Sequence, residues 1–294
     1  MVSTQKDPVL AILSLSGGND GLNTIIPRSN GLYRDFRPSL SISEDQIIPI
    51  NDDLGFHPAM GPLKKFWDEG KLAIFLGMGY PNSSYSHFRS MDIWHTCEPE
   101  KVGSEGWLGR AIRDLDPQGE NVLTGVNFGR GLPRSMAKDG VPVASVGDLS
   151  SYGLLTDIEE TGQRDRALDL FGRMYSPVLG RGVVNDYIRR TGLEAMAGAD
   201  ILGTAPGKYS STVEYGNSDV GRYLKDMVQI HNAGFGTRVL FTTAPYNIFD
   251  THANQAVGHS NLLMDISTNI DCFMTDLREQ NISDNVMLFF YSEF

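Results

Sequence analysis

Apolar residues along the chain fall into two kinds of segment. Short continuous apolar runs, typical of strands buried on both faces, occur at Val9–Leu15, Leu72–Leu76, Arg238–Thr243 and Val286–Tyr291, with a further strand expected at Val141–Val146. Between these runs, apolar residues recur every three or four positions, which predicts helices that pack on one face. Strands that alternate with helices predict an α/β fold with a mostly parallel sheet and helices on both of its faces.

The expected helices are spread over the whole chain. They are His57–Lys71, Phe88–His95, Trp107–Leu115, Gln163–Tyr175, Val183–Met196, Asp219–Asn232 and His259–Glu279. A stretch rich in Gly and Ser, Gly198–Ser218, predicts a long loop, and long loops within a domain are often functional.

The composition is that of an ordinary globular protein, with 40% hydrophobic and 21% charged residues in a chain of 294. A net charge of -11 argues against nucleic acid as a partner, because phosphate backbones are bound by clusters of Lys and Arg. No apolar run approaches the roughly 20 residues of a membrane-spanning helix, and no export signal precedes the first strand. Of the two cysteines, Cys272 is expected to be a buried thiol and no CxxC pair occurs. The oligomeric state is left open.

Polar side chains follow the expected strands at the points where these strands end. Asn19 and Asp20 follow the first strand, Ser83, Ser84, Ser86 and His87 follow the second, Asp250, His252 and Gln255 follow the third, and Ser292 and Glu293 follow the fourth. Ligands of open parallel sheets bind outside the carboxyl ends of the strands. We therefore expect these groups to converge on one edge of the sheet.

Such a set of side chains has a defined chemistry. Carboxylates and imidazoles together bind divalent cations such as Zn²⁺ or Mn²⁺. A bound cation lowers the pKa of a nearby hydroxyl and neutralises charge on a phosphoryl or sulfuryl group. Other catalytic templates fail, because the chain has no GxxxxGK[ST], GxSxG or HExxH motif. The pattern thus favours metal-dependent hydrolysis.

Several of these segments also have a purely structural interpretation. The glycine-rich stretch Gly17–Gly21 could be a ligand loop, but its spacing alone favours an ordinary tight turn. Ser86 has the position of a helix N-cap. Asp250 and His252 form the strongest local signal, an Asp-x-His pair in a loop after a strand. At the start of the last helix His259 is expected to cap the helix or face solvent. The other candidates for packing or surface roles are His57, His95 and His231.

A specific ordered set of motifs resembles a bacterial family, the domain-of-unknown-function family 1501. The motifs are SLSGGNDGLNTIIP, Phe56-His57-Pro58-Ala59, LKKFWDEGKLAIFLGMGYPNSSYSHFRSMDIW, GWLGR, FDTHANQ with His259, and YSEF. The resemblance runs from about Pro8 to Phe294 and is weakest between about Asp148 and Ser218.

That family is distantly similar to the alkaline phosphatase and sulfatase superfamily. The resemblance implies a three-layer α/β/α fold in one domain spanning 1–294, with a variable insertion at roughly 148–218. It implies one or two divalent cations (Zn, Ca, Mg or Mn) and a small anionic phosphate or sulfate ester as substrate. The metal ligands expected from it are Asp20, Asp250, His252 and Glu293, and the catalytic candidates are Ser86, with Ser83 and Ser84 as rivals, and His87.

The sequence departs from the superfamily where it has Ser-Glu-Phe in place of Asp-His, which leaves a second metal position open. Members of the family continue with Gly-Arg and a later Asp-His-Gly stretch, so the resemblance implies a chain truncated at its carboxyl end. It also implies export, since members usually carry a twin-arginine signal. Two alternatives stay open: a non-catalytic binding or surface protein that retains the fold, and a metal site with a structural role alone.

Overall fold

A computed structural model of the chain describes residues 7–150, 160–174, 198–199 and 201–294, and all structural statements below refer to these residues. Its centre is a parallel five-stranded sheet with the strand order β6-β5-β7-β1-β8. The strands are β1 (Val9–Leu15), β5 (Gly125–Phe128), β6 (Ala144–Val146), β7 (Val239–Thr243) and β8 (Val286–Ser292). Because every pairing in this sheet is parallel, all five strands end at the same edge.

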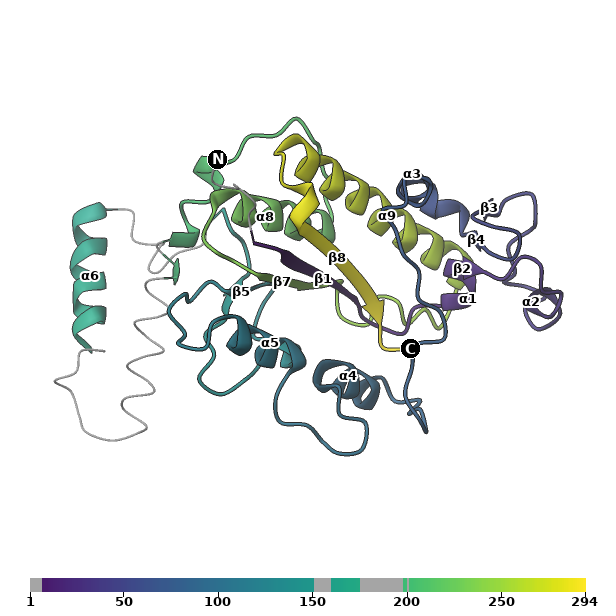
Figure 1. Ribbon diagram of the computed structural model, residues 1–294, viewed down its shortest axis with the longest axis horizontal. Coiled ribbons are helices and arrows are strands. Elements are labelled where there is room, and N and C mark those ends of the chain that lie inside the picture. The colour runs from purple at the N-terminus through teal and green to yellow at the C-terminus, as the bar shows by residue number, and fades with distance from the viewer. Residues whose placement is uncertain (1–6, 151–159, 175–197, 200) are drawn as a thin grey trace.

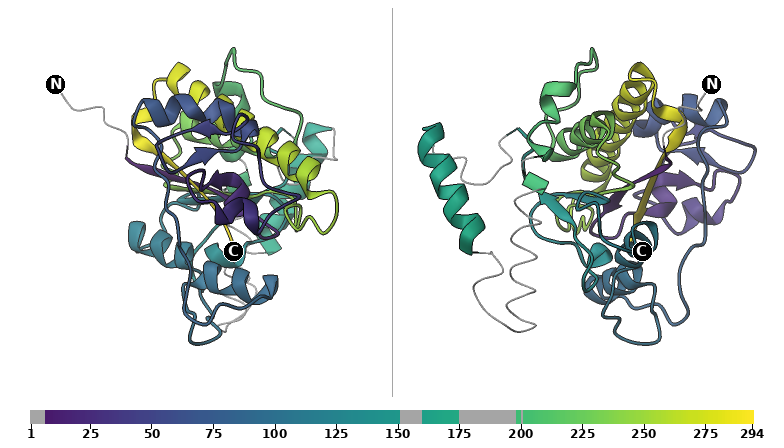
Figure 2. Two further views of the ribbon diagram at one scale, coloured as in Figure 1. Left: turned by 90° about the vertical axis from the view of Figure 1, so that its right-hand side faces the viewer. Right: turned by 60° about the vertical axis from the view of Figure 1, so that its left-hand side comes forward.

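Four helices cover the two faces of this sheet. The long helices α8 (Asp219–Ala233) and α9 (Gln255–Glu279) lie on one face, and α4 (His87–Thr96) and α5 (Trp107–Leu115) lie on the other (Figures 1 and 2). Alternate residues of β1 explain the arrangement, since successive strand side chains point to opposite faces. Leu13 belongs to the core cluster with α8 and α9, and Ile12 belongs to the cluster with α5.

A smaller antiparallel sheet lies beside α9 and has the strand order β2-β4-β3 (Figure 1). Its strands are β2 (Ile25–Ile26), β3 (Ile48–Pro49) and β4 (Gly55–Phe56). The remaining α-helices are α1 (Gly21–Thr24), α2 (Leu32–Asp35), α3 (Lys64–Asp68) and α6 (Thr161–Met174). The 3₁₀ turns are η1 (Pro58–Leu63), η2 (Arg134–Met136), η3 (Pro206–Lys208) and η4 (Ser283–Asn285).

Most expected elements are confirmed to within a few residues. The strand Val9–Leu15 and the helix Trp107–Leu115 have the expected bounds. Capping explains why α8 begins and ends where it does: Ser218 accepts a hydrogen bond from the backbone N–H of Gly221, and Gly234 ends the helix in the left-handed conformation at φ 73°. The expected helix Val183–Met196 lies outside the described residues.

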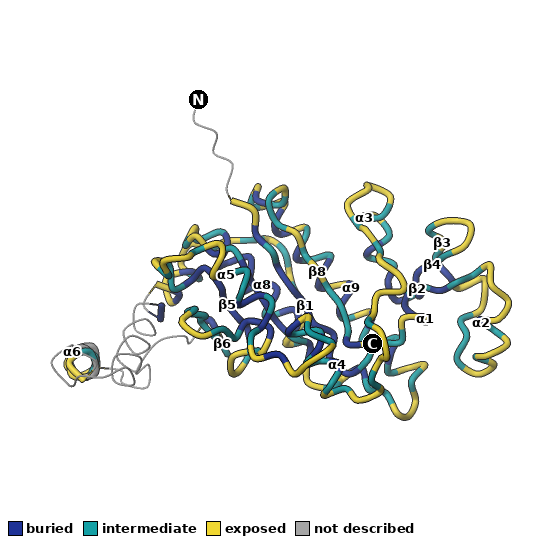
Figure 3. The backbone as a smooth tube through the Cα atoms, turned by 60° about the horizontal axis from the view of Figure 1, so that its bottom comes forward, coloured by how far each residue is buried: buried dark blue, intermediate teal, exposed yellow. Residues whose placement is uncertain are grey.

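The expected strand Leu72–Leu76 is wrong. This segment pairs with no strand of either sheet, and the side chains of Phe75 and Leu76 are 75% and 55% exposed. In Figure 3 most of the chain just after α3 is drawn as exposed. A continuous apolar run fits a buried strand only if a neighbouring strand offers its backbone groups, and no strand of the described residues does so here.

Prolines shorten two other expected elements. The helix expected at His57–Lys71 is instead the 3₁₀ turn η1 followed by the short α3, because Pro62 lacks the N–H that a helix interior needs. Similarly, β6 begins at Ala144 rather than Val141, after Pro142. No helix in the described part of the chain is long and apolar enough to cross a membrane. Both cysteines are free thiols; Cys272, expected to be buried, is only half-buried.

Candidate functional site

The carboxyl end of β1 is tied to the end of its neighbour β8 by hydrogen bonds between side chains and backbone. The N–H of Gly17 donates to Oε1 of Glu293 at 2.9 Å, and the N–H of Asn19 donates to Oγ of Ser292 at 2.8 Å. Segments more than 270 residues apart in the chain are thereby fixed against each other. The expected convergence of polar groups at the strand ends is present for β1 and β8.

Gly17 also brings the β1 loop against the loop that follows β7. Its backbone has φ +114°, and a Cβ at this position would lie 2.5 Å from the backbone nitrogen of Asp250. A residue with a side chain would therefore be strained and would displace the Asp250 loop. The glycine stretch is thus a turn that also allows a close approach of two loops, while its expected role as a ligand loop stays a prediction.

His87 lies between two carboxylates that follow different strands, Asp250 after β7 and Glu293 after β8. It is the first residue of α4, and its Nδ1 lies 3.0 Å from Oε1 of Glu293. Its Nε2 lies 3.6 Å from Oδ1 of Asp250, which is longer than a hydrogen bond. The ring of Phe294 packs against the imidazole, with 4.7 Å between the ring centroids.

His252 extends this group at its exposed end. Its Nε2 lies 3.0 Å from Oδ2 of Asp250, and its side chain is 85% exposed, whereas that of Asp250 is 23% exposed. We call the four residues Glu293, His87, Asp250 and His252 the acid–imidazole cluster. Within the described residues, the ion pairs of its two carboxylates are with these imidazoles and involve no Lys or Arg.

Asp20 has different partners. Its Oδ1 accepts a hydrogen bond from the N–H of Asn23 and caps α1, and its Oδ2 accepts from Arg37 Nη1 at 2.6 Å and Gln255 Nε2 at 2.5 Å. We call Asp20, Arg37 and Gln255 the Asp20 cluster. The structure places Asp20 on the same rim as the Asp250 loop, through Gln255, but neither Asp250 nor His252 is among the hydrogen-bond partners of its carboxylate.

The candidate serines lie on the approach to α4. Ser86 is exposed, and although it precedes the first helical residue its side chain makes no capping hydrogen bond. Ser83 donates to the carbonyl of Tyr80, while Ser84 Oγ accepts from the N–H of Ser86. The Ser86 hydroxyl, next in sequence to His87, is therefore the one not committed to these local contacts.

His259 is a site residue that sequence reasoning missed. The expected capping or solvent role is wrong, because α9 begins at Gln255 and His259 therefore lies one turn inside it, only 2% exposed. Its Nε2 lies 2.8 Å from Oδ1 of Asn19, and burial lowers the pKa of the imidazole. Its four-residue spacing from Leu263 marks the inner stripe of the helix and is the signal that could have placed it.

His57 packs beneath His259, as expected for a packing residue. The two rings meet edge to face at 5.9 Å, and His57 Nδ1 accepts a hydrogen bond from the N–H of Ala59. Burial, and then the neighbouring His259, lower the pKa of His57 to about 4. Both imidazoles are thus neutral near pH 7 and support the Asn19 side of the rim.

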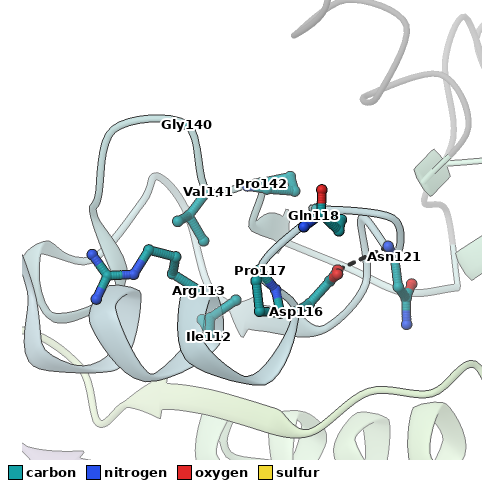
Figure 4. A pocket seen from close by; sticks show the side chains of 10 residues that line it. Ile112, Arg113, Asp116, Pro117, Gln118, Asn121, Gly140, Val141 and Pro142 are labelled. Carbon is teal, nitrogen blue, oxygen red and sulfur yellow. Dashed lines mark hydrogen bonds between the residues drawn. The ribbon is translucent and has the colours of Figure 1, made fainter.

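A cavity of about 90 Å³ lies away from this rim, between the end of α5 and the turns before β5 and β6 (Figure 4). Its one acidic residue, Asp116, accepts hydrogen bonds from Glu120, Asn121 and Thr124. Burial raises the pKa of its carboxyl group, but the hydrogen bonds together outweigh burial and lower it. Asp116 stabilises the turn that follows it in the chain, and the cavity lies at the opposite end of the strands from the rim. We therefore assign this cavity no part in the site.

Comparisons with known proteins give no relatives: no family model, no curated protein and no solved structure matches the chain. Nor does any group of three or more His, Cys, Asp and Glu side chains among residues 7–150, 160–174, 198–199 and 201–294 form a ready metal-binding arrangement. The acid–imidazole cluster contains four such residues, but they contact one another in pairs, Glu293 with His87, His87 with Asp250 and Asp250 with His252.

Proposed function

We propose that the protein is a divalent-metal-dependent hydrolase of phosphate or sulfate esters with a serine nucleophile. In this proposal its parallel sheet, with helices on both faces, is the core of a three-layer, alkaline phosphatase-like fold, as the resemblance to family 1501 implies. The observation that carries the proposal is the 3.6 Å separation between His87 Nε2 and Asp250 Oδ1.

This separation suits a cation better than it suits a direct contact. Two ligand atoms bound at about 2.1 Å to one tetrahedral cation lie roughly 3.4 Å from each other. A neutral imidazole whose Nδ1 carries the proton presents a lone pair at Nε2, and a carboxylate oxygen is also electron-rich. Two such atoms facing each other repel unless a cation or a proton lies between them.

The acid–imidazole cluster has the donors for such a cation. His87 and Asp250 would hold it, and His252, whose side chain is mostly exposed, would complete a set of two nitrogens and one carboxylate. Two imidazoles favour Zn²⁺ or Mn²⁺ over Mg²⁺ or Ca²⁺, which prefer oxygen. When bound, the cation would neutralise charge on the ester group and leave positions open for substrate.

Asp20 does not fit this set as it stands. The guanidinium of Arg37 already neutralises its carboxylate, and Gln255 donates to the same oxygen. We therefore propose a single cation at the acid–imidazole cluster. Asp20 would shape the rim instead, by capping α1 and by fixing the start of α9 through Gln255.

Ser86 would supply the nucleophile. Its exposed hydroxyl precedes His87, so a substrate bound at the cluster would lie beside it. The serine oxygen would attack the phosphorus or sulfur atom, and the ester oxygen would leave with a proton as an alcohol. Water would then release the serine-bound phosphate or sulfate and regenerate the hydroxyl.

The test combines metal binding with an ester panel. Zn²⁺ and Mn²⁺ titrated into metal-free protein by calorimetry should bind one ion per chain, and binding should be lost in Asp250→Asn. Chromogenic phosphate and sulfate esters should be cleaved by the metal-loaded protein, with Ser86→Ala inactive and Ser83→Ala, the matched control, active. Folded protein that binds neither ion would reject the proposal and favour a non-catalytic binding role.

A further inference from the structure

We propose that Glu293 is a positioning residue: it fixes the tautomer and direction of His87 and does not itself bind the cation. This inference deepens the proposed function and rests on it for the identity of the ligand that His87 would hold. It changes the role expected for Glu293 from metal ligand to hydrogen-bond partner of a ligand.

The first support is that the relevant oxygen of Glu293 is already fully used. Oε1 accepts from the backbone N–H of Gly17 at 2.9 Å and contacts His87 Nδ1 at 3.0 Å. The residue is only 4% exposed. A carboxylate oxygen has about two lone-pair sites, so Oε1 keeps none for a cation. The other oxygen, Oε2, lies 3.3 Å from the Ser292 hydroxyl.

The second support is the tautomer that these partners impose. An ionised carboxylate only accepts hydrogen bonds, so in the contact with Glu293 the imidazole must donate from Nδ1. In a neutral ring the proton on Nδ1 leaves Nε2 bare, and Nε2 is the atom that faces Asp250. A carboxylate behind a ligating histidine commonly sets its orientation in this way.

The third support is that the end of β8 holds the ring and the β1 loop as one unit. Ser292 Oγ donates to the carbonyl of Leu15 and accepts from the N–H of Asn19. Phe294 packs on the His87 ring, and a Cβ on Gly18 would overlap the ring of Phe294. Ser292, Glu293 and Phe294 therefore leave the His87 imidazole little freedom to rotate.

The decisive experiment reads the tautomer directly in metal-free protein. ¹⁵N-histidine NMR near pH 8 should show His87 protonated at Nδ1 in the wild type. Glu293→Gln, whose amide oxygen can still accept both hydrogen bonds, should keep this tautomer. Glu293→Ala should convert most of the signal to the Nε2-protonated form. Asp250→Asn is the matched control, because it alters the other neighbour of the ring and should leave Nδ1 protonated.

Metal titration of the same variants separates a positioning residue from a ligand. Glu293→Ala should weaken Zn²⁺ binding by about 10- to 100-fold, the usual effect of losing a partner behind a ligand, and Glu293→Gln should recover most of that loss. If Glu293→Gln loses as much affinity as Asp250→Asn, Glu293 is a ligand and the inference is overturned.

The two proposals fail separately. If the wild type binds no metal, the proposed function fails, while an Nδ1-protonated His87 that depends on Glu293 still establishes the positioning role. If the wild-type ring carries its proton on Nε2, or if Glu293→Ala leaves the tautomer unchanged, Glu293 does not position His87.

Discussion

The acid–imidazole cluster and the Asp20 cluster lie on the same rim and use similar residue types, but they differ in charge balance. Asp20 has a guanidinium as its partner at 2.6 Å, so its cluster is close to neutral. Among the described residues, Asp250 and Glu293 form ion pairs only with imidazoles, so with both rings neutral the acid–imidazole cluster carries two negative charges. Only the acid–imidazole cluster therefore has unbalanced negative charge that would attract a cation.

The largest difference between the clusters should appear in metal affinity. Asp250→Asn should weaken Zn²⁺ binding by more than about 100-fold, beyond the range for residues behind a ligand. Asp20→Asn keeps the α1 cap and should change the affinity no more than about fivefold, a difference of about 1 kcal/mol, because Arg37 already neutralises the Asp20 carboxylate. Calorimetric titration of both variants measures the contrast, and equal losses would place Asp20 among the ligands.

Lowering the pH should reduce the free energy of unfolding through His57, which is buried beneath the Asp20 side of the rim. The pKa of His57 is about 4 in the folded protein, against about 6.5 when unfolded. The unfolded chain therefore binds the proton first, and the contribution of His57 to stability falls as the pH drops from about 6.5 to about 4, by up to about 3 kcal/mol. Urea unfolding across this range measures the loss.

The matched variant for this pH effect is His57→Asn. An asparagine can also accept the hydrogen bond from the N–H of Ala59 that His57 accepts, but it does not titrate. The stability of the variant should therefore fall less than that of the wild type, or rise, as the pH drops from about 6.5 to about 4. An unchanged slope would mean that other groups account for the acid sensitivity.

The Asp20 cluster should also depend on its guanidinium for stability, though less strongly. Arg37→Met removes the charged partner of the Asp20 carboxylate, whose side chain is only 13% exposed, and leaves it the hydrogen bonds from Asn23 and Gln255. We expect the free energy of unfolding to fall by about 1–2 kcal/mol, the cost of leaving such a group poorly satisfied. Chemical denaturation provides the measurement, and Arg34→Met, which affects the exposed Glu44, is the control. Equal effects of the two variants would show that the Asp20 pair is not special.

The fold was predictable where a pattern has one physical meaning. The apolar run Val9–Leu15 is largely buried and lies inside the sheet, between β7 and β8. The run Leu72–Leu76 is equally apolar but pairs with no strand among the described residues. Whether a neighbouring strand is present depends on the whole fold and cannot be read from the run itself. Prolines such as Pro62 set further limits, because a residue without an N–H interrupts a helix even where the apolar spacing is helical.

The site was predictable as far as topology determines it. Parallel strands end at one edge, which is why His87, Asp250 and Glu293 meet although the sequence separates them widely. The pairing of Asp20 with Arg37 depends on how the loop around α2 folds back, and no periodicity encodes that contact. The burial of His259 follows from α9 starting at Gln255, four residues before the expected start.

One measurement tests the central claim most directly, namely that the cation is held by His87 and Asp250 and that Asp20 stays with Arg37. Crystals of the protein soaked in Zn²⁺ would be measured at the zinc absorption edge. We expect a single anomalous peak between Nε2 of His87 and the carboxylate of Asp250. A peak at Asp20, with Arg37 displaced, or a soaked crystal with no peak on this rim, would contradict the claim.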